Sequence, residues 1–302
     1  MSAFVNKTSK LFATFLFTFL ILISFAPSSA FAKAETHEAV IDWNTQTIRA
    51  LDMAIGLDGN IILVGDNTSS PGRVSKIDAS SGATIWTTDL PTSNALAVVL
   101  GLDGNPIVTG RGQGYHTFKL DYSNGNPIWD YGSGIEENGR ITTLNQNGNP
   151  VLLAENNSYI TLDAGTGTRL SITSLNIQNF SVTSMIIASD GNPIVFGTEP
   201  FFEETQAIRV IKLDQTTGNP TWDTTIDAYA VGVRIKQAPD GNPIVAYTNL
   251  DPNEFSVAKV NAATGAIIWN VVDDRQTNDF MWNMTIDSSG NPLVVGQTAV
   301  GG

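Results

Sequence analysis

Residues 102–129 read LDGNPIVTGRGQGYHTFKLDYSNGNPIW, and two glycine-centred turns divide this stretch into short apolar runs. The first turn is Asp103-Gly104-Asn105, and the second contains Asn124-Gly125. Asp-Gly and Asn-Gly pairs supply the positive φ that a tight hairpin turn needs. The stretch therefore predicts two successive β-hairpins.

The first turn recurs along the chain at a spacing of 43 to 50 residues, and the second motif alternates with it. The glycines of the first turn are Gly59, Gly104, Gly148, Gly191, Gly241 and Gly290. The second motif occupies Lys76–Trp86, Lys119–Trp129, Thr161–Ser171, Lys212–Trp222 and Lys259–Trp269. A four-stranded antiparallel meander with this period is typical of a β-propeller blade. We predict an all-β fold, a six-bladed β-propeller of four-stranded antiparallel blades, which occupies residues 33–302 as a single domain.

Tryptophan and lysine repeat within the second motif. The last-strand tryptophans are Trp43, Trp86, Trp129, Trp222 and Trp269, with Ser171 in the third repeat. We expect these rings to pack between blades with the indole N–H bonded to backbone, rather than to stack on a ligand. The repeated lysines are Lys76, Lys119, Lys212 and Lys259. Each precedes Asp or Asn by two residues on one strand face, which predicts an ion pair within the blade.

The two ends of the repeat region bear on closure of the ring. Residues Ala39 to Asn44 resemble an outer, Trp-bearing strand, and the sixth copy of the first hairpin ends near Thr298. We expect the amino-terminal strand to close the last blade, because pairing removes exposed sheet edges. One strand of that blade is then missing. Either the native blade has three strands or the protein is truncated at its carboxyl end here, and the stop within a loop favours the second interpretation.

Residues 1–32 have the pattern of a signal peptide. Lys7 and Lys10 precede an apolar stretch at residues 11–26, and Ala30-Phe31-Ala32 offers a cleavage site. We expect cleavage after Ala32 and a protein that is secreted or periplasmic. An uncleaved membrane anchor is the alternative, but the stretch is shorter than the ~20 residues that span a bilayer.

Composition narrows the possible functions. The formal net charge is −13, which argues against nucleic acid and anionic membranes as partners. The chain has no cysteine and only His37 and His116 as histidines, so disulfides, thiolate metal sites and cysteine nucleophiles are excluded. We identify no catalytic set and predict no metal site and no cofactor.

Two repeat families are similar to this sequence. The second motif resembles the tryptophan-docking repeat of pyrroloquinoline-quinone (PQQ) enzymes, best in Leu213–Trp222 and Val260–Trp269, and Thr285 to Thr298 is similar to the bacterial β-propeller repeat called SBBP. The resemblance implies the propeller fold. Residues that hold the quinone in those enzymes have no match here, including their vicinal cysteine pair.

In the predicted topology, all the repeated turns share one edge of the ring, and loops of varied length and content share the other. Variable loops on a rigid scaffold commonly carry binding function. The candidate binding residues on that edge are Glu136, Glu137, Glu155, Phe201, Phe202, Glu203, Glu204, Asp251, Glu254, Asp273 and Asp274. The alternative for each charge is a solvated loop residue.

The sequence favours an exported, non-catalytic binding module, most simply a monomer, whose partner is an unidentified protein, glycan or cation. A second reading is a secreted enzyme, either a quinoprotein-like oxidoreductase or a carboxylate-based lyase or hydrolase. A third is a repeat segment of a larger surface protein.

Overall fold

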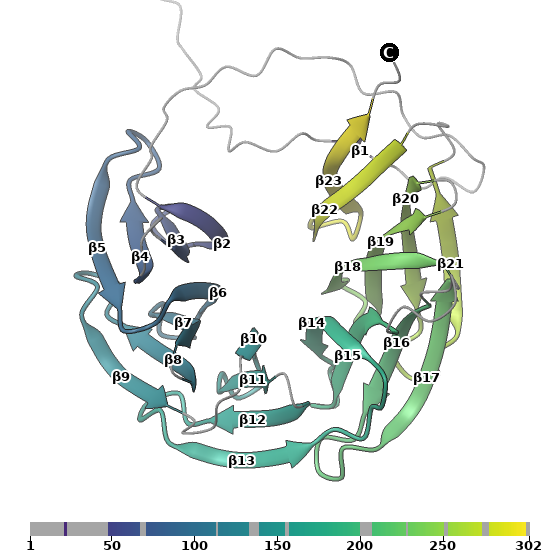
Figure 1. Cartoon of the computed structure of the whole chain (residues 1–302), viewed down its shortest axis with the longest axis horizontal. Coiled ribbons are helices and arrows are strands. Elements are labelled where there is room, and N and C mark those ends of the chain that lie inside the picture. The colour runs from purple at the N-terminus through teal and green to yellow at the C-terminus, as the bar shows by residue number, and fades with distance from the viewer. Residues whose placement is uncertain are drawn as a thin grey trace, which may run out of the picture.

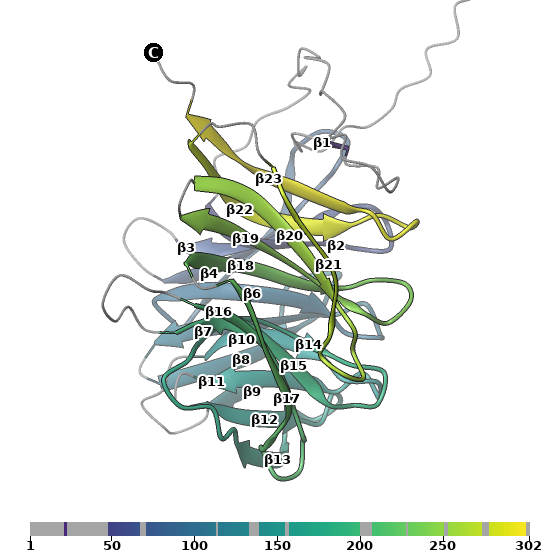
Figure 2. The same cartoon turned by 90° about the vertical axis from the view of Figure 1, so that its right-hand side faces the viewer.

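In the computed structural model, the described residues are 21–22, 48–66, 71–112, 114–132, 139–154, 157–199, 207–227, 229–250, 253–273 and 278–299. They form antiparallel sheets and contain no helix. The sheets surround a central opening (Figure 1) and are seen edge-on in Figure 2. The all-β, antiparallel prediction is therefore confirmed.

Five sheets have four strands each, which pair in chain order. The first contains β2 (Arg49–Ile55), β3 (Ile61–Asp66), β4 (Gly72–Ile77) and β5 (Thr84–Leu90). The second contains β6 (Asn94–Leu100), β7 (Pro106–Gly112), β8 (Gly114–Leu120) and β9 (Pro127–Gly132). The third contains β10 (Gly139–Leu144), β11 (Pro150–Ala154), β12 (Ser158–Leu162) and β13 (Arg169–Ser174). The fourth contains β14 (Ser181–Ile187), β15 (Pro193–Thr198), β16 (Ile208–Leu213) and β17 (Pro220–Asp227). The fifth contains β18 (Ala230–Gln237), β19 (Pro243–Leu250), β20 (Asn253–Val260) and β21 (Ile267–Val272).

The sixth sheet has three strands, in the order β1 (Ile21–Leu22), β23 (Pro292–Ala299) and β22 (Asn278–Ile286). The described strand next to β23 thus comes from within the expected signal peptide, with Ile21 opposite Val294. Residues 39–44, which we expected to close this sheet, lie outside the described residues. In Figure 1 the circle of ribbons is open between the first and last sheets.

Glycine turns form the hairpins because their backbone adopts positive φ. Gly104 has φ 78° and Gly125 has φ 77°. The Gly104 N–H donates to the Gly101 carbonyl at 2.9 Å, and the Asp103 carboxylate accepts the Asn105 N–H at 3.2 Å. An Asp side chain that bonds two residues ahead stabilises such turns. Both predicted hairpins of this stretch are confirmed.

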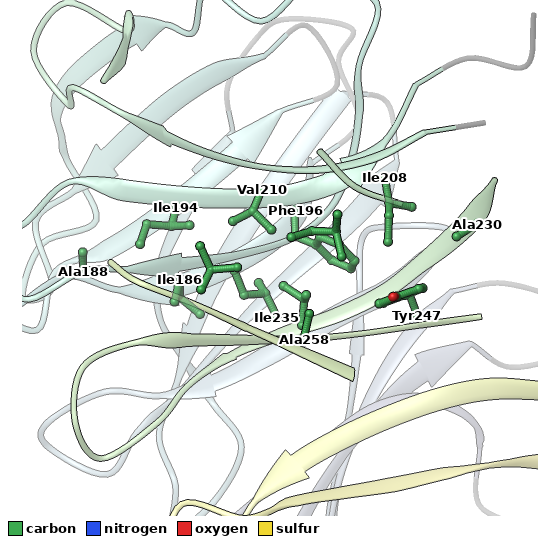
Figure 3. Packing of buried hydrophobic residues seen from close by; sticks show 13 residues of the cluster. Ile186, Ala188, Ile194, Phe196, Ile208, Val210, Ala230, Ile235, Tyr247 and Ala258 are labelled. Carbon is green, nitrogen blue, oxygen red and sulfur yellow. The ribbon is translucent and has the colours of Figure 1, made fainter. Parts of the chain in front are cut away.

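The core lies between neighbouring sheets. Figure 3 shows the cluster between the fourth and fifth sheets, where Phe196 of β15 and Tyr247 of β19 are fully buried. Every residue of β15 is buried, so this strand is covered on both faces. The Tyr247 hydroxyl donates to Asn270 Oδ1 at 2.9 Å, which satisfies its polar atom. Burial of both faces explains why the second strands read as continuous apolar runs rather than alternating ones.

Candidate functional site

The ring has two edges with different chemistry. We call the edge that carries the glycine turns the turn rim; its glycines are Gly59, Gly82, Gly104, Gly125, Gly148, Gly167, Gly191, Gly218, Gly241, Gly265 and Gly290. We call the opposite edge the loop rim; there second strands lead to third strands, and fourth strands lead to the next sheet. The loop rim includes the ends of β3 and β21 and the starts of β20 and β22. The antiparallel order confirms the predicted separation of turns from variable loops.

The repeated lysines of the turn rim form ion pairs within their own sheets, as predicted, but with a different aspartate. Lys76, Lys119, Lys212 and Lys259 lie 3.0, 2.7, 2.6 and 2.8 Å from Asp58, Asp103, Asp190 and Asp240, respectively. These partners belong to the first hairpin of the sheet. The aspartate of the lysine's own motif is already engaged: Asp78 accepts the Ser80 and Ser81 N–H groups at 3.0 and 2.9 Å.

These contacts fix the charge state of the turn-rim aspartates. Hydrogen bonds from Ser80 and Ser81 lower the pKa of Asp78 to about 2, and the bond from Lys259 lowers the pKa of Asp240 to about 2. The Tyr122 hydroxyl donates to Asp58 and lowers the pKa of that carboxyl, while burial and Asp58 raise the pKa of Tyr122. Favourable bonds to the ionised form explain each carboxyl shift.

The repeated tryptophans join neighbouring sheets. The indole N–H groups of Trp86, Trp129 and Trp222 donate to the carbonyls of Tyr122, Ala164 and Ala262 in the next sheet at 3.0, 3.1 and 3.2 Å. Each ring also lies on a glycine of that sheet; a β-carbon at Gly167 would lie 2.7 Å from Trp129 Cδ2. The structural interpretation of these three tryptophans is confirmed.

Ser171 changes the junction between the third and fourth sheets. At this junction the backbone of Ser174, rather than an indole ring, lies against the glycine of the next sheet. The approach is so close that a β-carbon at Gly218 would collide with the Ser174 carbonyl oxygen. The Asn176 N–H donates to the Gly218 carbonyl at 2.8 Å, and the Thr173 hydroxyl donates to the Gln215 carbonyl at 3.0 Å. The loss of the indole is thus offset by a closer approach of the two sheets.

The structure describes two of the candidate binding residues. Nine lie outside the described residues: Glu136, Glu137, Glu155, Phe201, Phe202, Glu203, Glu204, Asp251 and Asp274. Glu254 and Asp273 lie together at the loop-rim end of the fifth sheet, where the Asp273 N–H donates to the Phe255 carbonyl at 2.7 Å. Their exposed fractions are 6% and 2%, so the alternative of solvated loop charges is wrong for both.

Two buried carboxylates of the loop rim were missed in the sequence. Asp279 at the start of β22 is fully buried, and Asp66 at the end of β3 is 7% exposed. Arg49 is bidentate to Asp66, with its Nε 2.8 Å from Oδ1. The only sign of these two acids in the sequence was their position next to variable loops. Buried carboxylates require compensating bonds, so these acids belong to the framework of the rim.

Arginine pairs occupy other parts of the loop rim. Arg209 contacts Asp223 through its Nε at 3.0 Å and Glu199 through its Nη1 at 2.8 Å, and these bonds raise its pKa. Arg73 lies 2.6 Å from Asp89. Within the described ranges, no group of three potential metal ligands comes together. The same ranges hold no helix of the length and apolarity that a membrane crossing needs.

The four-stranded antiparallel sheets around a central opening, joined by Trp-on-glycine contacts, define a β-propeller. The sequence profile of a family described as outer membrane protein assembly factor BamB matches residues 34–161 and 156–302, and the chain belongs to this family. The match confirms the resemblance to PQQ-type repeats.

Solved structures share this fold. BamB from Moraxella catarrhalis is 16% identical, with 82% of this chain and 85% of that chain covered and a TM-score of 0.54. Kuenenia stuttgartiensis hydrazine synthase is 12% identical (85% and 75% covered, TM-score 0.64). The Myceliophteria thermophila Cps50 (Swd1) β-propeller domain is 9% identical (84% and 81% covered, TM-score 0.62). No curated protein sequence matches the chain.

Proposed function

We propose that this chain is an exported, non-catalytic propeller that binds a protein partner through its loop rim. One observation carries the proposal: the repeated polar side chains of the turn rim bond within the fold, as the lysine–aspartate pairs and aspartate-capped turns do. The turn-rim repeats are therefore explained by folding. The loop rim differs from sheet to sheet, as binding surfaces on rigid scaffolds do.

The class of partner follows from the family. Its description names an outer membrane protein assembly factor, and assembly of proteins requires contact with protein. Between β15 and β16 the sequence has the acidic residues Glu203 and Glu204 directly after the aromatic pair Phe201 and Phe202. Aromatic anchors within a charged border are the composition of protein interfaces. We propose a basic protein segment as the partner of a monomeric module that needs no cofactor.

A matched set of variants tests this proposal. The wild-type chain and the Glu203→Lys/Glu204→Lys variant are immobilised and exposed to an extracytoplasmic protein extract of the native host. The control carries the same change in charge on the turn rim, through lysine at four exposed positions: Leu57, Ser189, Thr216 and Ser288. Mass spectrometry should find a protein whose recovery falls at least tenfold with the loop-rim variant alone. Equal losses with both variants, or no such protein, would contradict the proposal.

A catalytic quinone would also contradict it. Addition of PQQ and calcium to the purified chain should leave the absorbance spectrum of the quinone unchanged. A saturable spectral change at one equivalent would favour the oxidoreductase alternative instead.

We further propose that the ring has six blades within one domain, and that Ala39 to Asn44 supplies the outer strand of the last one. The repeat supports this assignment: Trp43 matches the tryptophans that pack on the following sheet, and Gly82, with φ 71°, occupies in the first sheet the place that Gly125 has in the second. Trp43→Ala should then lower the free energy of unfolding by about 3 kcal/mol. A change below about 0.5 kcal/mol in urea unfolding would contradict this role.

We propose that the protein is exported. Residues 1–32 have the pattern of a signal peptide, and the description of the family names an outer membrane protein assembly factor. Amino-terminal sequencing of the mature protein should begin at Lys33. A mature protein that retains Met1 would contradict cleavage after Ala32.

A further inference from the structure

Two basic side chains of the innermost strand of the fifth sheet have no acidic partner among the residues that the structure describes. Arg234 and Lys236 alternate with the buried Ile235 on β18, so they project from the same face of that strand. Figure 1 shows β18 at the border of the central opening. Among the described residues, neither cation has a carboxylate within ion-pair distance.

This situation differs from that of most basic residues in the described part of the chain. The basic residues with a carboxylate partner are Arg49, Arg73, Lys76, Lys119, Arg209, Lys212 and Lys259. Acidic residues outnumber basic ones 29 to 16, so the chain has enough carboxylates to pair with two more cations. The fold nevertheless places Arg234 and Lys236 on one face of β18, with no carboxylate partner in the described part of the chain.

A β-bulge fixes the position of this pair. The register of β18 with β19 shifts between Gly232 and Arg234. The inner strands of the other sheets have register shifts at the same place, as between Met281 and Asn283 in β22. Bulges redirect the side chains that follow them, so this repeated feature of the framework sets where the side chains after it lie. Arg234 and Asn283, each directly after a bulge, meet across neighbouring sheets, where Arg234 Nε donates to Asn283 Oδ1 at 3.0 Å.

Lys236 is exposed to solvent, and the charges around it act on its amine. Desolvation lowers the pKa of its amine and the neighbouring Arg234 lowers it further, whereas Asp52 of β2 raises it. The influence of Asp52 means that a charge on the first sheet reaches this amine. Asp52 itself accepts the Val98 N–H at 3.0 Å, so its carboxylate is already engaged with the second sheet. The cluster therefore carries two positive charges against one negative charge.

We infer that Arg234 and Lys236 on β18, with Asn283 of β22 holding the guanidinium in place, form a binding site on these inner strands for a small oxyanion with two or more negative charges. A guanidinium and an ammonium side by side suit the oxygens of a carboxylate or phosphate group. Such a ligand removes the repulsion between the two cations. The site lies on the inner strands rather than on the loop rim, so it goes beyond the proposed protein contact.

Calorimetric titration of the full chain at low ionic strength tests the site. Citrate and inorganic phosphate are the two probes, and they separate carboxylate from phosphate recognition. At least one should bind with one-to-one stoichiometry, and Lys236→Gln and Arg234→Gln should each weaken it at least tenfold. Lys259→Gln, which removes the same charge from the turn rim, should change the affinity less than twofold.

Thermal unfolding supplies a second readout that does not depend on tight binding. Without added anion, Lys236→Gln should unfold at the wild-type temperature or above it, because one of two like charges is removed. Addition of 10 mM citrate or phosphate should raise the unfolding temperature of the wild type but not that of Lys236→Gln. The rise should be the same at all protein concentrations.

Failure of both probes to bind the wild type would overturn the inference, as would equal weakening by Lys259→Gln. A lower unfolding temperature of Lys236→Gln without anion would also overturn it, because it would mean that the fold already provides Lys236 with a partner.

Discussion

The turn rim and the loop rim use charge in opposite ways. On the turn rim, Lys212 bonds Asp190 in its own sheet and the Ala262 carbonyl in the next at 3.0 Å, and the same arrangement recurs around Lys119. On the loop rim, contacts differ from sheet to sheet, from the Arg209 pairs to the buried Glu254 and Asp273. Repetition therefore marks the parts that hold the ring together, and variation marks the edge to which we assign the proposed binding surface.

The largest effect should come from the indole that joins two sheets on the turn rim. Trp129 is 8% exposed and packs on Gly167, so Trp129→Ala creates a cavity and removes the bond to Ala164. The free energy of unfolding should fall by about 3–5 kcal/mol in urea unfolding. Ser171→Ala, at the same position of the next sheet, should cost less than about 0.5 kcal/mol because that side chain is exposed. Similar losses for both would contradict the assigned role of the indole.

A second pair of variants tests the close approach of the third and fourth sheets. Gly218 and Gly241 both have positive φ, but only Gly218 faces a backbone carbonyl, while nothing lies within 4 Å of a β-carbon at Gly241. Gly241→Ala should cost about 1–2 kcal/mol from backbone strain alone. Gly218→Ala should cost about 1–3 kcal/mol more because the two sheets must separate. Equal unfolding free energies of the two variants would show that the sheets are not in contact there.

The sequence predicted the regular features of this molecule better than its individual ones. Glycine turns such as Gly104 are local, so their spacing reveals hairpins and sheets without tertiary information. The partner of Lys76 depends on the register between β3 and β4, and the approach of Gly218 to Ser174 depends on sheet packing. Burial of Glu254 and Asp273 arises from neighbouring strands that no local pattern encodes. Most of the candidate site lies in loops outside the described residues, where its predicted role remains a prediction.

Removal of an ion pair should lower the free energy of unfolding slightly more on the turn rim than on the loop rim. The Lys212 side chain is 9% exposed and bonds two acceptors, whereas the Arg73 side chain of the Arg73–Asp89 pair on the loop rim is 23% exposed. Lys212→Met should lower the free energy of unfolding by about 1–2 kcal/mol. Arg73→Met should lower it by about 0–1 kcal/mol, because exposed ion pairs contribute little. The reverse order in chemical unfolding would contradict the structural role of the turn-rim lysines.

The smallest effect concerns pH. The pKa of Asp78 in the folded chain, about 2, lies below the ordinary value of 3.8, so its contribution to stability is complete above pH 4 and is lost as pH falls towards 2. Asp78→Asn should keep the turn, as Asn261 does by accepting the Ala263 N–H at 3.0 Å, but should weaken this pH dependence. Urea unfolding at pH 5, 3 and 2 measures how steeply the free energy of unfolding changes with pH. An unchanged slope in the variant would mean that folding does not lower the pKa of Asp78.

Site-specific photo-crosslinking in the native host tests the functional difference between the rims most directly. A photoreactive amino acid is placed at Glu203 on the loop rim or at Leu57 on the turn rim, where the side chain is 98% exposed. The proposed function predicts a discrete crosslinked protein from position 203 and none from position 57. Crosslinks from position 57 alone, or from neither position, would contradict the assignment of binding to the loop rim.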